Sequence, residues 1–219
     1  MSERLSDLLL AENRRSWDAM QAHRFVQAVE RDALPPDVFK AYLVYEGDFV
    51  EIAILIFGHM LVKAPDLAER RWLAGVLQAL ASEQVGYFER TYAALGITPA
   101  DRARALPPAV LAFRNGMLAI ARDGGYLDGV VIMMAAEWLY ATWCSRAATA
   151  SLSNPELQRW VDMHAEPAFL AQAEWLRRQV DESRDLGPET LRHLCGLFGR
   201  ALDLEIAFHS APFEHGGAP

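Results

Sequence analysis

Apolar residues recur at helical spacing along almost the whole chain, and no stretch alternates apolar and polar residues as a half-buried strand would. Prolines and glycines divide this pattern into segments: Pro35 and Pro36 end one, Gly96 suits the C-cap of another, and Pro167 should kink a third. The predicted helices cover about residues 6–22, with Ser6 as the N-cap, then 24–34, 37–63, 65–95, 108–122, 127–149, 155–182 and 189–210. The pattern therefore predicts an all-α helical bundle.

Length and composition fit one domain without covalent cross-links. The chain has 219 residues, 52% of them hydrophobic, which is enough to bury a core of its own. We expect a single domain over residues 1–215 and a disordered tail over 216–219. Cys144 and Cys195 lack metal-binding spacing, which predicts free thiols in a reducing compartment. Because neither a secretory signal nor an apolar run of about 20 residues is present, we expect a cytoplasmic protein outside the membrane.

The charge and the absent motifs exclude several classes of function. The net charge is −8, and the basic residues form isolated pairs such as Arg14-Arg15, which argues against a nucleic-acid partner. The sequence has no HExxH motif, no Glu-x-x-His pair, no GxGxxG or Walker loop, and no Gly-x-Ser-x-Gly elbow. We therefore predict neither a metal site nor a cofactor.

Two glutamates stand inside apolar stripes of predicted helices. Glu46 recurs at helical spacing with Tyr42 and Phe57, and Glu205 does so with Phe198. A charged carboxylate is seldom fully buried without a partner, so two such positions far apart in sequence suggest a functional site. Burial also raises the pKa of a carboxyl group in general, which suits a general acid near neutral pH.

A purely structural interpretation of these two glutamates is also open. Each of them could cap a helix end or pair with an arginine, such as Arg114 or Arg192. Asp48 and Glu51 lie away from the centre of the apolar stripe, and we expect them to be solvated.

The most informative segment is the apolar helix that contains residues 133–140, Met-Met-Ala-Ala-Glu-Trp-Leu-Tyr. Glu137 and Tyr140 project about 60° apart around its axis, so they point in much the same direction. One interpretation makes them neighbours in a site. The other places Glu137 on a solvated flank and makes Tyr140 an ordinary core aromatic residue.

The stretch Ala136-Glu137-Trp138-Leu139-Tyr140 resembles the C-x-W-x-Y motif of the TenA family, the thiaminase II relatives with a haem-oxygenase-like helical fold. Ala136 stands where that family has its nucleophilic cysteine. The chain also resembles the family before this stretch, at residues 39–43 and 111–113, and after it, at residues 160 and 205–208. These pieces occur in the family's order. The resemblance implies a haem-oxygenase-like bundle that forms a homodimer or homotetramer.

The resemblance also implies a site. In the family, a pocket inside the bundle stacks a thiamin-type aminopyrimidine between aromatic side chains. Glu46 falls on the acidic residue that binds the ring, Tyr140 on the motif tyrosine, and Glu205 on the C-terminal glutamate that handles protons. Phe113 and His164 fall where tyrosines are common, which implies a remodelled pocket. The other implied substrate-binding residues are Tyr45, Phe49, Ala136, Trp138 and Phe208.

Alanine at position 136 supplies no thiolate, so cysteine chemistry is not expected there. The resemblance is to the Cys-lacking branch of the family, which is associated with hydrolysing amino- or formylamino-pyrimidines in thiamin salvage. We expect Glu46, Glu137 and Glu205 to be the catalytic carboxylates, with one activating water and another protonating the leaving amine. Two alternatives stay open: a non-catalytic protein that binds a small heteroaromatic molecule, and a relative of the PqqC-like oxidases, against which the low basic content counts.

Overall fold

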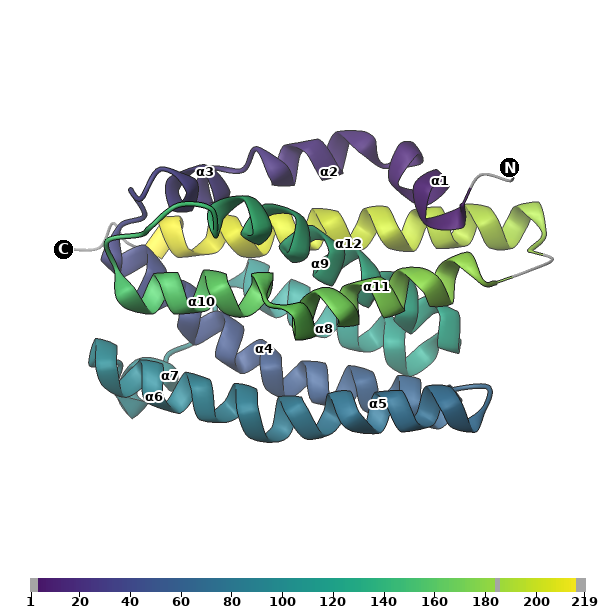
Figure 1. Ribbon diagram of the computed structural model, residues 1–219, viewed down its shortest axis with the longest axis horizontal. Helices are drawn as coiled ribbons and strands as arrows, with labels where there is room; N and C mark the ends of the chain where they lie inside the picture. Colours follow the sequence, from purple (N-terminus) through teal and green to yellow (C-terminus); the bar gives the residue numbers. More distant parts are fainter. Residues whose placement is uncertain (1–3, 184–185, 216–219) are drawn as a thin grey trace. The chain divides into compact units, whose positions relative to one another are not determined.

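The computed structural model describes residues 4–183 and 186–215, and within these ranges the chain forms helices and no strand (Figure 1). The elements are α1 (Leu5–Glu12), α2 (Arg14–Gln21), α3 (Arg24–Glu30), α4 (Pro36–Lys63), α5 (Leu67–Ala79), the π-helical turn η1 (Leu80–Gln84), α6 (Val85–Leu95), α7 (Pro99–Arg102), α8 (Pro108–Asp123), α9 (Tyr126–Ala147), α10 (Pro155–Ala165), α11 (Pro167–Asp181) and α12 (Pro188–His215). This confirms the predicted all-α class. None of the described helices is both long enough and apolar enough to span a membrane.

The chain divides into two compact units, each assembled from separate stretches of sequence. The first unit comprises residues 1–34 and 130–206, and the second comprises residues 35–129 and 207–219. The expectation of one domain over residues 1–215 stays a prediction. The expected disordered tail at 216–219 lies outside the described residues.

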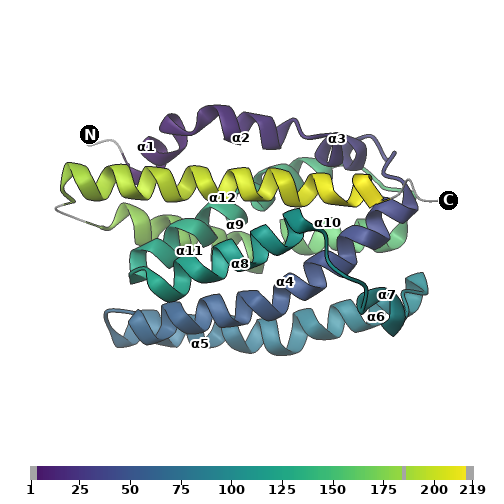
Figure 2. The same ribbon diagram turned by 180° about the vertical axis from the view of Figure 1, so that it is seen from behind.

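In the second unit, α4 is the central helix. It packs against α5, α6 and α8, and Figure 2 shows α4 lying along α5 and α8. Pro36 occupies the first turn of α4, where a missing N–H costs nothing. At the other end of α4, Lys63 Nζ donates hydrogen bonds of 2.6, 2.8 and 2.7 Å to the carbonyls of Ala121, Arg122 and Gly124. This cation satisfies carbonyls that the end of α8 leaves without helical partners.

Gly47 allows α4 and α6 to approach closely. A Cβ atom at this position would lie 1.8 Å from the Tyr92 hydroxyl oxygen, and that hydroxyl donates to the Leu43 carbonyl at 3.1 Å. Because Tyr92 is buried and hydrogen-bonded, its ring cannot swing aside without losing this contact. We expect Gly47→Ala to lower the free energy of unfolding by about 1–3 kcal/mol, the usual cost of overpacking.

Gly58 provides the matched control on the same helix, because a Cβ there meets nothing within 4 Å. Gly58→Ala is expected to raise the free energy of unfolding by about 0.5–1 kcal/mol through its better helix propensity. Urea unfolding followed by circular dichroism measures both variants. Equal effects of the two substitutions would contradict the packing account.

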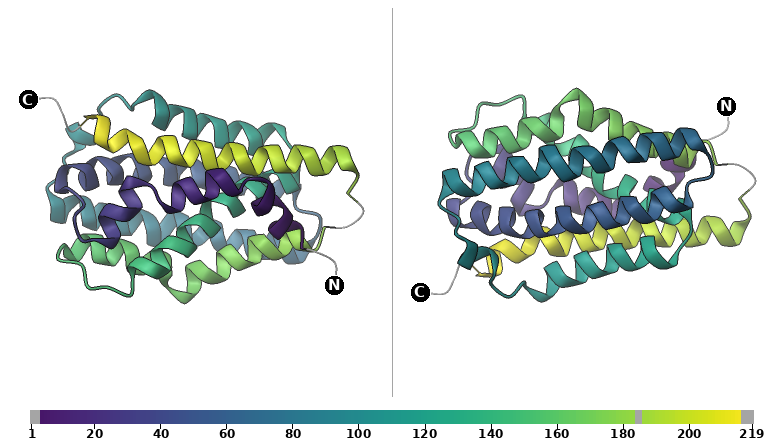
Figure 3. Two further views of the ribbon diagram at one scale, coloured as in Figure 1. Left: turned by 90° about the horizontal axis from the view of Figure 1, so that it is seen from above. Right: turned by 90° about the horizontal axis from the view of Figure 1, so that it is seen from below.

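In the first unit, the predicted helix over residues 6–22 is wrong as a single element. The structure has two helices that change direction at Asn13, as Figures 1 and 3 show. Asn13 Nδ2 donates to the Leu9 carbonyl of α1 at 2.9 Å and to the Cys195 carbonyl of α12 at 3.0 Å, so its side chain connects the end of α1 to α12. Ser6 is not the N-cap: it lies inside α1 and its backbone N–H donates to Asp181 at 2.8 Å.

The other helices follow the prediction with local differences. The predicted helix over residues 65–95 is interrupted by the π-helical turn η1, and Gly96 ends α6 in the left-handed conformation with φ 67°. The predicted connection after Gly96 contains the short helix α7, which begins with a capping box between Thr98 and Asp101. Pro167 does more than kink a helix, because α10 ends at Ala165 and α11 starts at Pro167. The last helix continues to His215 and includes Pro212.

Candidate functional site

Glu137 is a buried carboxylate on α9 in the first unit. Only 7% of the residue is exposed, which rules out the solvated flank as its position. Its Oε1 accepts a hydrogen bond of 2.6 Å from Gln172 Nε2 on α11, while Oε2 is buried and has no hydrogen-bond partner among the described residues. Burial raises the pKa of Glu137 to about 8, although the Gln172 hydrogen bond works in the opposite direction. Glu137 is therefore largely protonated at neutral pH.

The side chain of Trp138, next to Glu137, has defined neighbours in the same unit. The Trp17 ring of α2 lies 4.9 Å from it between ring centroids, and the Arg177 guanidinium carbon of α11 lies 4.2 Å from its centroid. A cation this close to a tryptophan face is attracted by the ring's negative charge density. Through Trp138, the segment of α9 that carries Glu137 packs against Trp17 of α2 and Arg177 of α11.

Tyr140 and His164 stack in an aromatic cluster that joins α9 to α10. Their ring centroids are 5.3 Å apart at an interplanar angle of 28°. The other members of this cluster are Trp143, Trp160 and Phe169. The structure thus brings Tyr140 and His164 into contact, and their role in one substrate site stays a prediction.

His164 has a defined protonation state. Its Nδ1 lies 2.8 Å from the Trp160 carbonyl, and a carbonyl only accepts, so Nδ1 carries the hydrogen. Burial lowers the pKa of His164 to about 4, despite an opposing contribution from the Trp160 carbonyl. The ring is therefore neutral at pH 7, and its Nε2 is an acceptor. A tyrosine at this position would instead offer a hydroxyl donor.

Ala136 and Glu205 complete the predicted residues of the first unit. Ala136 is 4% exposed on α9, and Glu205 is 1% exposed on α12. Phe198 and Ala201, which share the stripe of Glu205, are also fully buried. The periodicity therefore predicted the burial of Glu205 correctly.

In the second unit, Glu46 lies on the buried face of α4 with 8% of its surface exposed. The predicted aromatic residues of this unit form a continuous row: Phe49 lies 4.4 Å from Phe113 and Phe113 lies 4.7 Å from Phe208, measured between ring centroids. The row continues to Tyr42, which lies 5.7 Å from Phe208. These flat apolar surfaces suit an aromatic ligand.

Asp48 is not solvated as predicted. Its carboxylate accepts two hydrogen bonds from Arg114 Nη1, at 3.0 and 3.2 Å, and its side chain is 28% exposed. Partial burial raises its pKa, against the opposing effect of the Arg114 charge. Arg114, which the structural interpretation offered as a partner for Glu46 or Glu205, thus pairs with Asp48.

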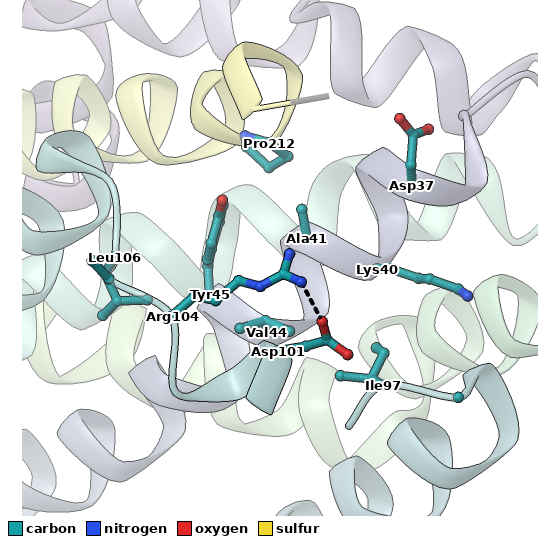
Figure 4. A pocket seen from close by; sticks show the side chains of 12 residues that line it. Asp37, Lys40, Ala41, Val44, Tyr45, Ile97, Asp101, Arg104, Leu106 and Pro212 are labelled. Atoms are coloured by element: carbon teal, nitrogen blue, oxygen red, sulfur yellow. Dashed lines mark ion pairs between the residues drawn. The ribbon is translucent and has the colours of Figure 1, made fainter. Parts of the chain in front are cut away.

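Tyr45 faces a pocket at the surface of the second unit, shown in Figure 4. The pocket has a volume of about 450 Å³ and lies between α4, α7 and the segment that follows α7. Tyr45 is 8% exposed, burial raises its pKa, and its hydroxyl end points toward Pro212. Arg104 and Asp101, which both line this pocket, form an ion pair of 2.9 Å.

The predicted site residues are distributed over both units. The first contains Ala136, Glu137, Trp138, Tyr140, His164 and Glu205, and the second contains Tyr45, Glu46, Phe49, Phe113 and Phe208. The prediction that Glu46, Tyr140 and Glu205 serve one pocket stays a prediction.

Sequence reasoning missed Gln172, the hydrogen-bond donor to Glu137. It also gave no role to His209, which is fully buried on α12 and lies 5.4 Å from the Tyr42 ring. Gln172 and Glu137 are 35 residues apart and share no helix, so no spacing pattern connects them. The sequence did contain a signal for His209, because it stands four residues after Glu205 and helical spacing places both on the same face of α12.

Comparison with known proteins finds a family model and named relatives that are similar to this chain. The model of the TENA/THI-4/PQQC family matches residues 10–213. An aminopyrimidine aminohydrolase of Bacillus subtilis (strain 168) is 20% identical over 167 residues, which cover 76% of this chain and 68% of the relative. An aminopyrimidine aminohydrolase of Helicobacter pylori is 22% identical over 162 residues, which cover 73% of this chain and 75% of the relative.

Solved structures show the same fold. A TenA homologue from P. horikoshii OT3 superposes with a TM-score of 0.87 at 19% identity, covering 97% of this chain and 99% of that one. A domain with a heme oxygenase-like fold from Shewanella denitrificans OS217 superposes with a TM-score of 0.78 at 13% identity, covering 99% of this chain and 94% of that one. The predicted haem-oxygenase-like architecture is confirmed.

Proposed function

Because the chain belongs to the TENA/THI-4/PQQC family, we propose that it is a hydrolase of thiamin-derived aminopyrimidines that uses carboxylates where other relatives use a cysteine. Two curated relatives are named aminopyrimidine aminohydrolase, which supports this reaction class. The substrates we propose are 4-amino-5-aminomethyl-2-methylpyrimidine and its formylamino derivative.

The observation that carries the proposal is the state of Glu137. This residue directly follows Ala136, it is buried, and its pKa is raised to about 8. A carboxylic acid that keeps its proton at pH 7 is suited to general acid catalysis. Its Oε2 has no partner among the described side chains and backbone groups, so this oxygen is available to a ligand.

The reaction assigns a proton donor and a proton acceptor. For the aminomethyl substrate, hydrolysis breaks the bond between the exocyclic carbon and the amine nitrogen, forms a bond from that carbon to a water oxygen, and releases ammonia; cleavage of the same bond in the formylamino derivative would release formamide. The departing nitrogen must gain a proton, which Glu137 donates in our proposal. The attacking water must lose a proton, which Glu205 accepts. The two carboxyl groups thus take opposite roles, and proton exchange with solvent returns each to its starting state before the next turnover.

The remaining predicted residues bind the substrate in this account. Glu46 accepts hydrogen bonds from the ring amine, and the aromatic row of Phe49, Phe113 and Phe208 supplies stacking surface. Tyr140 and His164 are also substrate-binding residues in this proposal, and neutral His164 offers an acceptor. Tyr45, Ala136 and Trp138 stay in the proposed substrate-binding set.

Ammonia release tests the proposal. Purified protein is incubated with each pyrimidine, and ammonia is measured with a coupled glutamate dehydrogenase assay while the pyrimidine product is identified by mass spectrometry. We expect one ammonia for each hydroxymethyl product formed from the aminomethyl substrate. Binding without any turnover of either compound would instead support the non-catalytic alternative.

Replacing Glu46 tests the binding role separately. Glu46→Gln keeps the size of the side chain but turns a charge-assisted hydrogen bond into a neutral one, which is weaker by about 1 kcal/mol. We expect the Kd for 4-amino-5-aminomethyl-2-methylpyrimidine, measured by calorimetry, to rise about five-fold. Glu51→Gln on the exposed side of the same helix is the matched control. If both variants bind as tightly as the wild type, Glu46 does not contact the ring.

A further inference from the structure

Glu137 is held asymmetrically by one neighbour. Gln172 Nε2 donates to Oε1 at 2.6 Å, from α11 to α9, whereas Oε2 receives no hydrogen bond from any described residue. Buried polar atoms almost always have a partner, so an unsatisfied carboxyl oxygen in a residue that is only 7% exposed needs an explanation. A ligand that completes the set of hydrogen bonds supplies one.

The asymmetry determines where the carboxyl proton sits. The amide N–H of Gln172 occupies the Oε1 side and leaves no room for a second hydrogen between the two groups. When Glu137 is protonated, its proton therefore resides on Oε2. A carboxyl group anchored at one oxygen also cannot rotate freely, so the direction of its O–H bond is set as well.

We propose that Gln172 is a positioning residue, which holds Glu137 by Oε1 and presents the protonated Oε2 to the leaving nitrogen of the substrate. This inference rests on the proposed hydrolase function. It adds to that function a residue on a different helix, which acts only through Glu137.

No charged neighbour of Glu137 among the described residues takes the place of the Gln172 hydrogen bond. Among the described residues, the charged or titratable side chains with contacts to α9 near Glu137 are His164 on α10 and Arg177 on α11. The other buried carboxylates of the unit are Glu156 and Glu205. Arg177 lies over the Trp138 ring and pairs with Glu174 at 3.2 Å. The pKa shift of Glu137 has two causes, burial and the Gln172 hydrogen bond, so none of these charges produces it.

The test replaces Gln172 with Met, which has similar length and no hydrogen-bond donor. Losing the donor removes a hydrogen bond that favours the ionised form, so we expect the pKa of Glu137 to rise by about one to two units. Carbon-13 NMR of labelled glutamate side chains, assigned with Glu137→Gln, reads this pKa without any turnover. The limb of the kcat–pH profile that Glu137 controls should move upward by the same amount.

Kinetics should change in one parameter only. We expect kcat to fall about ten- to a hundred-fold because the acid is no longer oriented, while KM stays within about two-fold. Gln179→Met, two turns along the same helix at a similarly half-buried position, is the control and should change neither the pKa nor kcat. Gln172→Asn, whose donor is one methylene too short, should repeat the effect of Gln172→Met and serves if that variant fails to fold.

The outcomes separate this inference from the proposed function. A raised pKa of Glu137 together with a shifted profile supports the positioning role. An unchanged pKa in both Gln172 variants would overturn it, and so would a loss of kcat without a shift, because that pattern indicates a structural defect. If the wild type releases no ammonia, the proposed hydrolase fails, and with it the catalytic part of the inference, while the NMR titration still reports whether Gln172 holds Glu137.

Discussion

Replacing Glu137 with glutamine is expected to lower kcat for ammonia release about 10²–10⁴-fold at pH 7, the usual contribution of a general acid. Glutamine retains the volume and the oxygen that accepts from Gln172, but its amide N–H is not acidic enough to protonate a leaving amine. Substrate binding should change little. Steady-state kinetics of ammonia release measure the effect, and a variant that keeps wild-type kcat would remove Glu137 from the mechanism.

The same variant has an expected effect on stability with a definite sign. The pKa of Glu137 is raised from 4.5 to about 8 by burial, so between these values the unfolded chain loses this proton and the folded protein keeps it. Rising pH therefore favours unfolding of the wild type, by at most about 1.4 kcal/mol for each pH unit in this window. Glu137→Gln lacks this group, so the wild type should lose stability relative to it between pH 5 and pH 8. Parallel curves of unfolding free energy would contradict the raised pKa.

Glu205→Gln is expected to lower kcat by a similar factor, about 10²–10⁴-fold, because the variant cannot take a proton from the attacking water. Glu205 is 1% exposed and glutamine fits the same space, so folding should be preserved. The Kd for the aminopyrimidine should stay close to that of the wild type.

Glu189→Gln, in the exposed first turn of the same helix, is the matched control for Glu205. It should keep the wild-type kcat. If Glu205→Gln instead weakens binding and leaves kcat unchanged, Glu205 is a binding residue and another group must activate the water.

Periodicity predicted much of the fold, because burial of an apolar stripe decides which face of a helix turns inward. Glu46 and Glu205 were identified in this way, and both are buried. The same reasoning left the side of Glu137 undecided, since α9 is apolar almost all round and a single stripe cannot be distinguished on it. The structure shows that Glu137 faces α11, because Gln172 on that helix donates a hydrogen bond to its carboxylate.

The structure differs from the sequence-based predictions where residues far apart in the sequence determine the local structure. Asn13 ends α1 because its amide bonds to the backbone at Cys195, a contact that no window of neighbouring residues contains. Asp48 was expected in solvent because it lies off the apolar stripe, but Arg114 on α8 pairs with it. Gln172 escaped notice for the same reason: its role depends on which helices are adjacent, and periodicity does not report adjacency.

The most direct measurement of the central claim uses 4-amino-5-aminomethyl-2-methylpyrimidine in water enriched in oxygen-18, with ammonia and the pyrimidine product quantified together. Carboxylate-assisted hydrolysis predicts one ammonia for each hydroxymethylpyrimidine, with the heavy isotope in the new hydroxyl group, and a rate that falls at least a hundred-fold in Glu137→Gln. A wild-type protein that binds the compound but releases no ammonia, and incorporates no heavy oxygen, would contradict the account.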